Sequence, residues 1–523
     1  MKYNRTKNAT RNIFFNLLMK IYNMVVPFLL RTLFIYIMGV QYMGLGSLFT
    51  SILSVLNLAE LGVGSAMVYS MYKPLSEDDI DTVCALMNLY KKYYRIIGFV
   101  VLALGVLFCP ILPYIIKDEL PADINLYVLY FLNLASTVIT YWLFAYKNCI
   151  INANQRNDIT SKIQIIINAL TSILQVIVLV VFRNYYLYLI VSIVMGLLSN
   201  IITAVVADKM FPHFQAKGQL PKKSISAINK RVRDLFTAKL GTVVVHSSDT
   251  IVISAFLGLT ALTQYQNYYF IMTSVAGFIA IVYSSMTSII GNSIVSETWE
   301  KNYRDFKILF FIISWISGIC SACFLCLYQP FVELWMGKEL LLDFGMVICF
   351  CTYFFASEIN RVFLLYKDAS GMWHSDKYRS LTISLLNLGL NIASVKYLGL
   401  YGIILSTITP MILVGYPWLV HNLSHEIFRP SKQKNIYMRL VAYVATTAIS
   451  AIITYGICTL IHLPLIPTII VRGILCLIIP NILFLLVYRN TADFQATLKF
   501  VHTNFLKNRF QKIIKLLERN TND

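Results

Sequence analysis

The sequence predicts an all-α integral membrane protein. Of its 523 residues, 58% are hydrophobic and 13% are charged, whereas soluble proteins carry about 25% charged residues. Apolar runs of about 20 residues, the length that crosses about 30 Å of hydrocarbon, recur along the whole chain. The longest loop on the side opposite the N-terminus, Pro330 to Asp343, has about fourteen residues and is too short for a folded domain. We therefore expect no extramembrane enzyme domain.

About fourteen membrane spans are expected from these runs. In chain order they cover residues 12–38, 45–72, 95–117, 125–149, 160–182, 185–207, 234–257, 264–290, 306–329, 344–366, 379–396, 402–423, 438–459 and 467–488. An even number of spans leaves both ends of the chain on the same side of the membrane.

The distribution of lysine and arginine predicts which side that is, because basic loops stay in the cytoplasm. Basic residues cluster at residues 2–11, 91–95, 217–233 and 429–434. The opposite loops carry only Lys117, Arg183, Lys338 and Lys396. Both termini of this multi-pass protein are thus expected in the cytoplasm. Topology and attraction to anionic membrane lipid account for the net charge of +19, without nucleic acid as a partner.

An internal repeat is visible in the sequence. A shift of 219 residues places Lys20 on Lys239 and Gly39 on Gly258, and a shift of 220 places Tyr146 on Tyr366. Six spans per repeat predict two lobes in the same orientation, related by a pseudo-two-fold axis along the membrane normal, with a central cavity.

The repeat divides the chain into five parts. They are an N-terminal lobe at 1–208, a basic cytoplasmic linker at 209–233, a C-terminal lobe at 234–424, two extra helices at 438–489, and a basic amphipathic cytoplasmic tail at 490–523. We expect the tail to lie on the inner leaflet, or else to dock on the protein.

Two cations in the first expected span are the first candidate site residues. Lys20 and Arg31 are eleven residues apart, which at about 100° per residue places both on one helix face. Such a charge within a span costs about 2.5–3.5 kcal/mol on insertion scales, so it needs a cavity, a partner or a ligand. We expect both to bind an anion in the cavity. The alternatives are that each reaches toward its nearer interface, or that Lys20 pairs with Glu60.

The repeat adds Lys239 as a third candidate cation, with snorkelling to the interface as its alternative. The acids Glu60, Asp249 and Glu358 are candidate groups for coupling to Na⁺ or H⁺. Arg361 lies one helical turn after Glu358, so these two residues are expected to form a local ion pair.

No catalytic constellation is visible, and we expect neither an enzyme nor a cofactor. The sequence has no phosphate-binding glycine loop and no nucleophile with its base. Cys320, Cys323 and Cys326 share one apolar span without a neighbouring histidine or acid. This pattern favours packing over a metal site.

Four stretches carry a family resemblance. They are GVQYMGLGSLFT at 39–50, LAELGVGSA at 58–66, YKPL at 72–75 and SDTIVISAFLGL at 248–259. They resemble the bacterial polysaccharide biosynthesis and O-antigen or capsule flippase family. The resemblance extends over nearly the whole chain and implies membership of the multidrug, oligosaccharidyl-lipid and polysaccharide exporter superfamily.

The resemblance implies a flippase for a polyprenyl-diphosphate-linked oligosaccharide, working by alternating access in the cytoplasmic membrane. Its partners would be that lipid-linked glycan, membrane lipids and the polysaccharide polymerase machinery. Arginine and lysine suit a diphosphate, and related drug exporters bear an acid in the first span where this chain has Lys20 and Arg31. The alternative is a cation-coupled multidrug exporter of the same superfamily.

Overall fold

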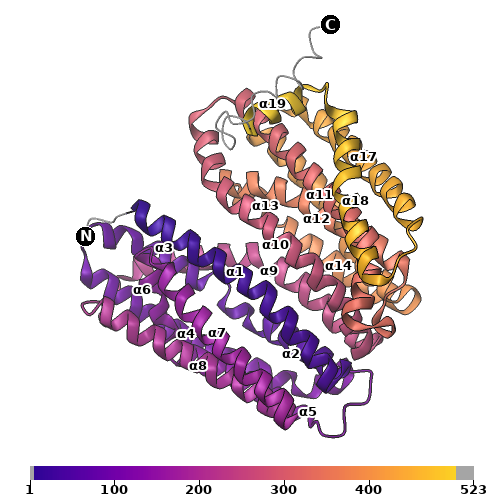
Figure 1. Ribbon diagram of the computed structural model, residues 1–523. Coiled ribbons are helices and arrows are strands. Elements are labelled where there is room, and N and C mark those ends of the chain that lie inside the picture. The colour runs from indigo at the N-terminus through magenta and orange to yellow at the C-terminus, as the bar shows by residue number, and fades with distance from the viewer. Residues whose placement is uncertain (1–4, 502–523) are drawn as a thin grey trace. The chain divides into compact units, whose positions relative to one another are not determined.

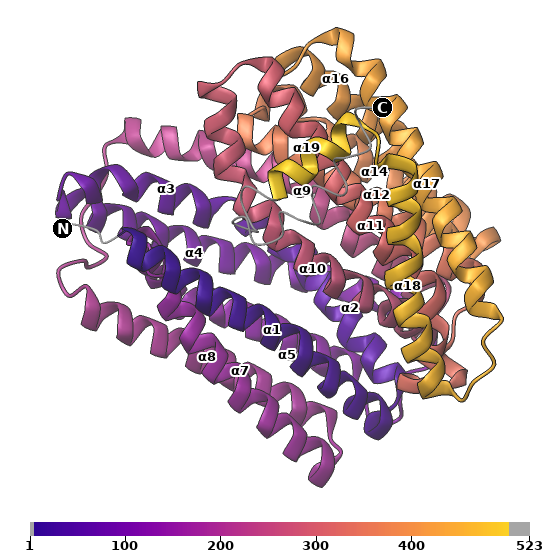
Figure 2. The same ribbon diagram turned by 45° about the horizontal axis from the view of Figure 1, so that its top comes forward.

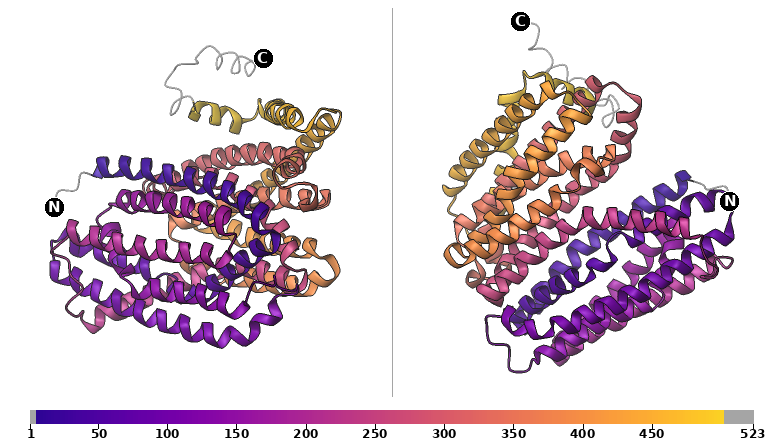
Figure 3. Two further views of the ribbon diagram at one scale, coloured as in Figure 1. Left: turned by 60° about the horizontal axis from the view of Figure 1, so that its bottom comes forward. Right: turned by 180° about the vertical axis from the view of Figure 1, so that it is seen from behind.

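The computed structural model describes residues 5–501, and every regular element in this part of the chain is helical. Within this range, the following side chains are not described: those of residues 5–10, 12–14, 16, 59, 238, 239, 242, 288, 373, 374, 500 and 501. The chain forms two compact units, residues 1–263 and 264–523. In each unit the long helices run beside one another as a bundle (Figure 3).

The first unit contains α1 (Arg5–Met38), α2 (Val40–Leu56), α3 (Val63–Ser76), α4 (Ile80–Phe108), α5 (Leu126–Trp142), α6 (Asn148–Ala153), α7 (Asn157–Ile177), α8 (Tyr185–Met210) and α9 (Lys222–Phe256) (Figure 1). Helix α10 (Leu259–Ser296) begins in the last residues of the first unit and belongs mostly to the second. The second unit continues with α11 (Trp299–Met336), α12 (Phe344–Ser370), α13 (Trp373–Asp376), α14 (Arg379–Leu398), α15 (Leu400–Pro410), α16 (Tyr416–Glu426), α17 (Gln433–Thr459), α18 (Leu465–Tyr488) and α19 (Ala492–Val501).

Short helical turns join or interrupt these helices. The 3₁₀ turns are η1 (Asn57–Glu60), η2 (Cys109–Ile115), η3 (Ala145–Lys147), η5 (Lys338–Leu340) and η7 (Pro430–Lys432), and the π-helical turns are η4 (Val178–Phe182) and η6 (Met411–Gly415).

Eleven helices within residues 5–501 are long and apolar enough to cross a membrane, or twelve if the bent pair Leu126–Trp142 and Ala145–Ala153 counts as one span. The predicted count of fourteen is therefore not confirmed. The difference lies in two expected spans. Residues 45–72 are divided between α2 and α3, and within residues 234–257 the apolar helix Val243–Phe256 is too short to count as a span.

The break between α2 and α3 has a local cause. Gly62 has a φ of 88°, a conformation that glycine adopts at little cost. A Cβ atom at Gly62 would lie 2.6 Å from the Cβ of Leu235 on α9. The glycine thus permits both the turn and the close approach of α9, which packs against α2 and α3. Helix α9 lies in the first unit of the structure, whereas the sequence repeat grouped residues 234–257 with the second lobe.

The same backbone conformation occurs at two positions that the sequence repeat aligns. Gly39 joins α1 to α2 with a φ of 100°, and Gly258 joins α9 to α10 with a φ of 98°. The repeat match at this position therefore corresponds to a shared way of connecting two helices.

The core of the second unit is built around α11. Helices α12, α17 and α18 pack against it (Figure 2). The ring of Phe310 on α11 lies 5.6 Å from that of Phe363 on α12 and 5.1 Å from that of Tyr443 on α17. Aromatic pairs at such distances add about 0.5–1.5 kcal/mol each to the free energy of burial. The two expected extra helices, α17 and α18, are thus integral to this unit.

The predicted linker and tail are both held against helices. In the linker, Gly218 accepts a 2.8 Å hydrogen bond from the Asn88 amide of α4, and the chain becomes helical from Lys222. In the tail, Phe494 of α19 is buried against Phe311 and Trp315 of α11. The rest of the tail, residues 502–523, lies outside the described part.

Candidate functional site

The two cations of the first span lie on α1, which packs against α7 and α2 in the first unit. Lys20 is exposed, and Arg31 is partly buried. Tyr22, near Lys20, shares a 2.8 Å hydrogen bond with Ser172 of α7, which fixes α1 against its neighbour. Arg31 is one turn beyond Pro27, the proline inside this helix. The assignment of both cations to an anion-binding cavity stays a prediction.

Glu60 lies in the turn between α2 and α3 and is surrounded by tyrosines. Its carboxylate oxygens accept hydrogen bonds of 2.7 Å each from the hydroxyls of Tyr94 on α4 and Tyr141 on α5. Tyr90 in turn donates to Tyr94 at 2.6 Å. Among the described residues no ion pair joins Glu60 to Lys20. The carboxylate therefore ties three segments of the first unit together.

The candidates on α9 are described unequally. Asp249 is buried, with 7% of its surface exposed, and its neighbours Ser248 and Thr250 are buried as well. The backbone of Lys239 belongs to the same helix, but its side chain lies outside the described part. The roles of both residues stay predictions.

Glu358 is fully buried on α12, and its carboxylate lies 3.3 Å from the guanidinium of Arg361. The predicted ion pair is confirmed. Arg361 also donates to the carbonyl of Ala276 on α10, and the hydroxyl of Tyr283 donates to the backbone carbonyl of Glu358 at 2.8 Å. These contacts join α12 to α10 at the buried carboxylate.

An apolar groove of about 740 Å³ runs along the second unit. Its walls come from α11, α12, α17 and the segment from η6 to α16, and none of the residues that line it is charged. Helix α17 contributes a long wall from Leu440 to Tyr455, about 22 Å at 1.5 Å per residue. Val441 also lines an open hollow formed by the first turns of α17, including Lys434 and Tyr437.

A proline and a π-helical turn shape one wall of this groove. Pro410 has no N–H to donate within its helix, and the π-helical turn Met411–Gly415 follows it directly. Such turns are frequent at functional sites. Here the turn leads into Tyr416, which lines the groove and donates a 2.6 Å hydrogen bond to the carbonyl of Ala356 on α12, another lining residue.

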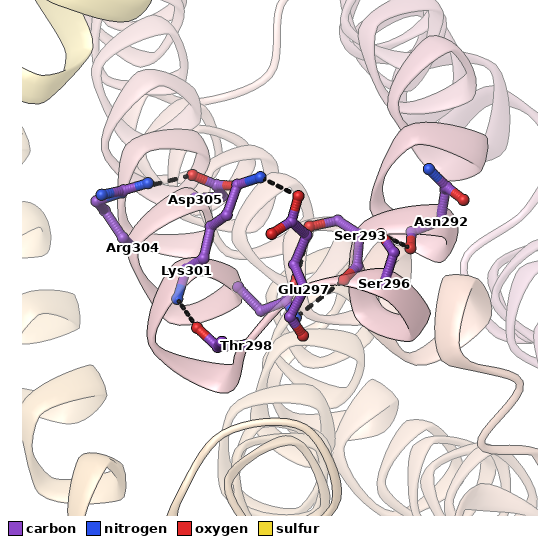
Figure 4. A network of polar contacts seen from close by, with 9 residues as sticks. Asn292, Ser293, Ser296, Glu297, Thr298, Lys301, Arg304 and Asp305 are labelled. Carbon is purple, nitrogen blue, oxygen red and sulfur yellow. Dashed lines mark hydrogen bonds and ion pairs between the residues drawn. The ribbon is translucent and has the colours of Figure 1, made fainter.

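A second cavity, of about 350 Å³ and with charged residues in its lining, lies at the turn between α10 and α11. Figure 4 shows the charged side chains of Glu297, Lys301 and Asp305 gathered at this turn. Lys301 pairs with Glu297, and Ser293 shares hydrogen bonds with Asn302. Charges of both signs compensate one another here, so this network stabilises the turn between the two helices.

Two buried ion clusters were not expected from the sequence. In the first unit, the fully buried Asp158 is contacted by Arg11 at 2.7 Å, Arg156 at 3.0 Å and Lys162 at 3.9 Å.

In the second unit, Asp376 is contacted by Arg379 through two hydrogen bonds and by Lys367 at 3.5 Å. In each cluster, paired cations offset the cost of burying a carboxylate. The short spacings, Arg156 to Asp158 and Asp376 to Arg379, are signals that the sequence offered. The contact of Arg11 with Asp158 joins two helices, and no sequence spacing indicates it.

Comparisons with known proteins agree with this architecture. A family model described as polysaccharide biosynthesis protein matches residues 9–289. The fold is similar to that of a lipid II flippase, MurJ, in an inward closed conformation, with a TM-score of 0.64 and 16% identity over 91% of this chain and 99% of that chain.

Two MATE transporters are also similar. A Vibrio cholerae MATE transporter matches with a TM-score of 0.53 and 15% identity over 80% of this chain and 98% of that one. An outward-facing MATE family transporter of the MOP superfamily matches with a TM-score of 0.51 and 14% identity over 79% and 94%. No curated protein matches the chain. At these identities the likeness shows the fold, which is that of a multi-pass membrane protein.

Proposed function

The chain belongs to the polysaccharide biosynthesis protein family, and from this membership we propose that it is the flippase for a polyprenyl-diphosphate-linked oligosaccharide. The protein is a membrane transporter of the MurJ and MATE fold and not an enzyme. In the proposed function it moves the lipid-linked repeat unit of a surface polysaccharide, such as an O-antigen or a capsule, from the cytoplasmic to the outer leaflet. Two lobes rock about a central cavity, and both termini lie in the cytoplasm.

The apolar groove along α17 is the observation that carries this proposal. Its volume of about 740 Å³ is within the range of about 300–1,000 Å³ for ligand sites. Its lining offers no charge for a cationic drug. A polyprenyl tail gains little hydrophobic free energy by leaving lipid for this groove, because both surroundings are hydrocarbon. The groove therefore guides the tail, and the affinity must come from the head group.

The proposed head-group ligands are Arg31, Lys20 and Lys239. A diphosphate accepts charge-assisted hydrogen bonds, and arginine offers its donors in a planar fork that matches phosphate oxygens. Each such hydrogen bond is worth about 1.5–3 kcal/mol. We therefore expect Arg31→Ala to weaken the binding of polyprenyl diphosphate about tenfold or more and Arg31→Lys to weaken it less. Native mass spectrometry of the purified protein measures this, with a neutral polyprenol as the control.

The groove is tested by filling it. Ala448 lines the groove, whereas Ile449, the next residue on α17, is 56% exposed and does not line it. Ala448→Trp should stop export and leave Ile449→Trp, its matched control, active. The readout is polymer on the surface of cells that lack the native protein and carry the variant at equal abundance. Normal export by Ala448→Trp would remove the groove from the transport path.

A cation-coupled multidrug exporter is the second candidate, because the fold is also similar to MATE transporters. Asp249, Glu358 and Glu60 are the acids proposed to couple such transport to Na⁺ or H⁺. The two functions give opposite results in cells that lack the protein. A flippase defect leaves lipid-linked repeat units on the cytoplasmic leaflet with drug sensitivity unchanged, and an exporter defect does the reverse.

A further inference from the structure

Three cysteine thiols meet inside the second unit. Cys326 on α11, Cys458 on α17 and Cys476 on α18 have their sulfur atoms within 4.8 Å of one another. All three are buried, with at most 1% of their surface exposed. The sequence placed Cys326 beside Cys323 on one helix, but only the fold brings Cys458 and Cys476 to the same point.

Two further groups complete this thiol cluster. Cys323, one helical turn before Cys326, packs against it. Arg472, one turn before Cys476 on α18, directs its guanidinium to the carbonyl of Cys326 at 3.5 Å. The Cys476 thiol faces the carbonyl of Ala322 at 3.7 Å. The cluster therefore contains a fourth sulfur and a cation.

The sulfur separations fit metal coordination better than a disulfide. A zinc–sulfur bond of about 2.3 Å in a tetrahedral site sets the sulfur atoms about 3.8 Å apart. Thiols within 4.8 Å need to approach by at most about 1 Å to reach that geometry. A disulfide needs the two sulfur atoms about 2.05 Å apart. The movement needed for metal binding is the smaller of the two.

The charges also balance, which matters for a site enclosed by apolar helices. Thiols bind metal as thiolates and release their protons to water. Three thiolates with Zn²⁺ carry a net charge of −1, and two thiolates with Cu⁺ carry the same charge. Arg472 supplies +1 in either case. Without that cation, the complex would leave an uncompensated charge in low-dielectric surroundings.

We propose that Cys326, Cys458 and Cys476 bind one thiophilic metal ion, either Zn²⁺ through all three thiolates or Cu⁺ through two of them, with Cys323 packed beside the site. Soft thiolate ligands select these two ions. Cys458 is one residue from the end of α17, so the loop between α17 and α18 gives the ion a route to the site. The bound ion fastens α17 and α18 to α11. Because α17 is also a wall of the apolar groove, the metal fixes the position of that wall.

Metal content tests the proposal directly. The full-length protein is purified in detergent under reducing, metal-free conditions and incubated with Zn²⁺ or Cu⁺. After desalting, its metal content is measured by inductively coupled plasma mass spectrometry. We expect about one metal ion per protein and at least a tenfold loss of affinity in Cys458→Ala and Cys476→Ala. Cys149→Ala removes a buried thiol of α6 in the first unit, and this variant should bind metal normally.

A second measurement on the unaltered chain does not depend on how the variants fold. An ion that binds only the folded state raises the thermal midpoint in proportion to the logarithm of its concentration. We expect Zn²⁺ or Cu⁺ to raise the midpoint of the wild type, and a chelator to reverse the shift. Absence of stoichiometric metal in the wild type would overturn the proposal. A disulfide between two cluster cysteines, formed under mild oxidation in protein that had bound no metal, would also overturn it. Such a bond lowers the intact mass by two hydrogen atoms.

Discussion

Glu60 accepts hydrogen bonds from Tyr94 and Tyr141, which come from two different helices. Removing the carboxylate leaves two largely buried hydroxyls without their acceptor, at a cost of about 1–3 kcal/mol each. We expect Glu60→Ala to lower the thermal midpoint of the purified protein clearly, and Glu60→Gln, which keeps one acceptor oxygen, to lower it less.

The same pair of variants separates a structural role of Glu60 from a coupling role. If Glu60 holds the helices together, Glu60→Gln should export polymer at a rate near that of the wild type per folded molecule. Loss of export with an unchanged thermal midpoint would assign Glu60 to ion coupling instead.

Glu358 and Arg361 form a pair in which the acid is fully buried and the side chain of the base is 39% exposed. Removing the base leaves a buried carboxylate without its cation, which is strongly destabilising. We expect Arg361→Ala to cost about 2 kcal/mol or more in stability, and Glu358→Gln in the same chain to recover most of that loss. A double-mutant cycle on the thermal midpoint measures the coupling between the two residues. Additive effects would mean that the pair contributes no interaction energy.

Ion pairs differ in how far the sequence reveals them. Glu358 and Arg361 are three residues apart on one helix, so helical geometry alone predicts their contact. Arg11 and Asp158 meet across two helices, and no local pattern announces that approach. The charged residues that sequence reasoning selected were those inside apolar runs. The buried Asp158 and Asp376 lie next to helix ends, where an acid is unremarkable in the sequence.

At the scale of elements, the glycines that join the paired helices give a matched test. Gly39 and Gly258 both have φ near 100°, but a Cβ at Gly39 would meet nothing within 4 Å, whereas a Cβ at Gly258 would lie 2.3 Å from a carboxylate oxygen of Asp118. That carboxylate also accepts the N–H of Leu259 at the start of α10 at 2.7 Å. Alanine at either position costs about 1–3 kcal/mol in backbone strain.

Gly258→Ala should therefore destabilise the protein more than Gly39→Ala, because it also displaces the cap of α10, worth about 0.5–2 kcal/mol. Asp118→Ala removes the cap alone and should therefore destabilise the protein less than Gly258→Ala does. Thermal midpoints of the three variants in one detergent check this order. Equal midpoints for the two glycine variants would show that the Asp118 side chain can move away from residue 258 without lowering the stability of the protein.

The helices themselves follow from the sequence wherever an apolar run is unbroken. The expected span 344–366 corresponds to α12 and 467–488 to α18 within a few residues, because a single hydrophobic run of that length has one stable form in lipid. The run 45–72 was different, since it turns at Gly62, where Leu235 of α9 approaches closely. Hydropathy averages over such a turn and does not detect it.

At the scale of the whole molecule, hydropathy and the family motifs led to the correct fold class and family, because both are properties of long stretches of chain. The groove along α17 could not be predicted in this way. Its walls come from helices between residues 321 and 455, and a groove is the space that their packing leaves. The same holds for the thiol cluster, whose three sulfurs are up to 150 residues apart in sequence.

Membrane orientation is the remaining prediction at this scale. The basic segments around residues 217–233 and 429–434 should stay in the cytoplasm, because lysine and arginine near the ends of spans resist translocation. A green fluorescent protein fused after Asp523 should therefore fluoresce, and alkaline phosphatase at the same place should be inactive. Phosphatase inserted after Lys338, in a loop with few basic residues, should be active. A green fluorescent protein that fluoresces at both positions would contradict the odd number of spans expected between Lys338 and Asp523. An active phosphatase at Asp523 would reverse the orientation on which the direction of lipid transport depends.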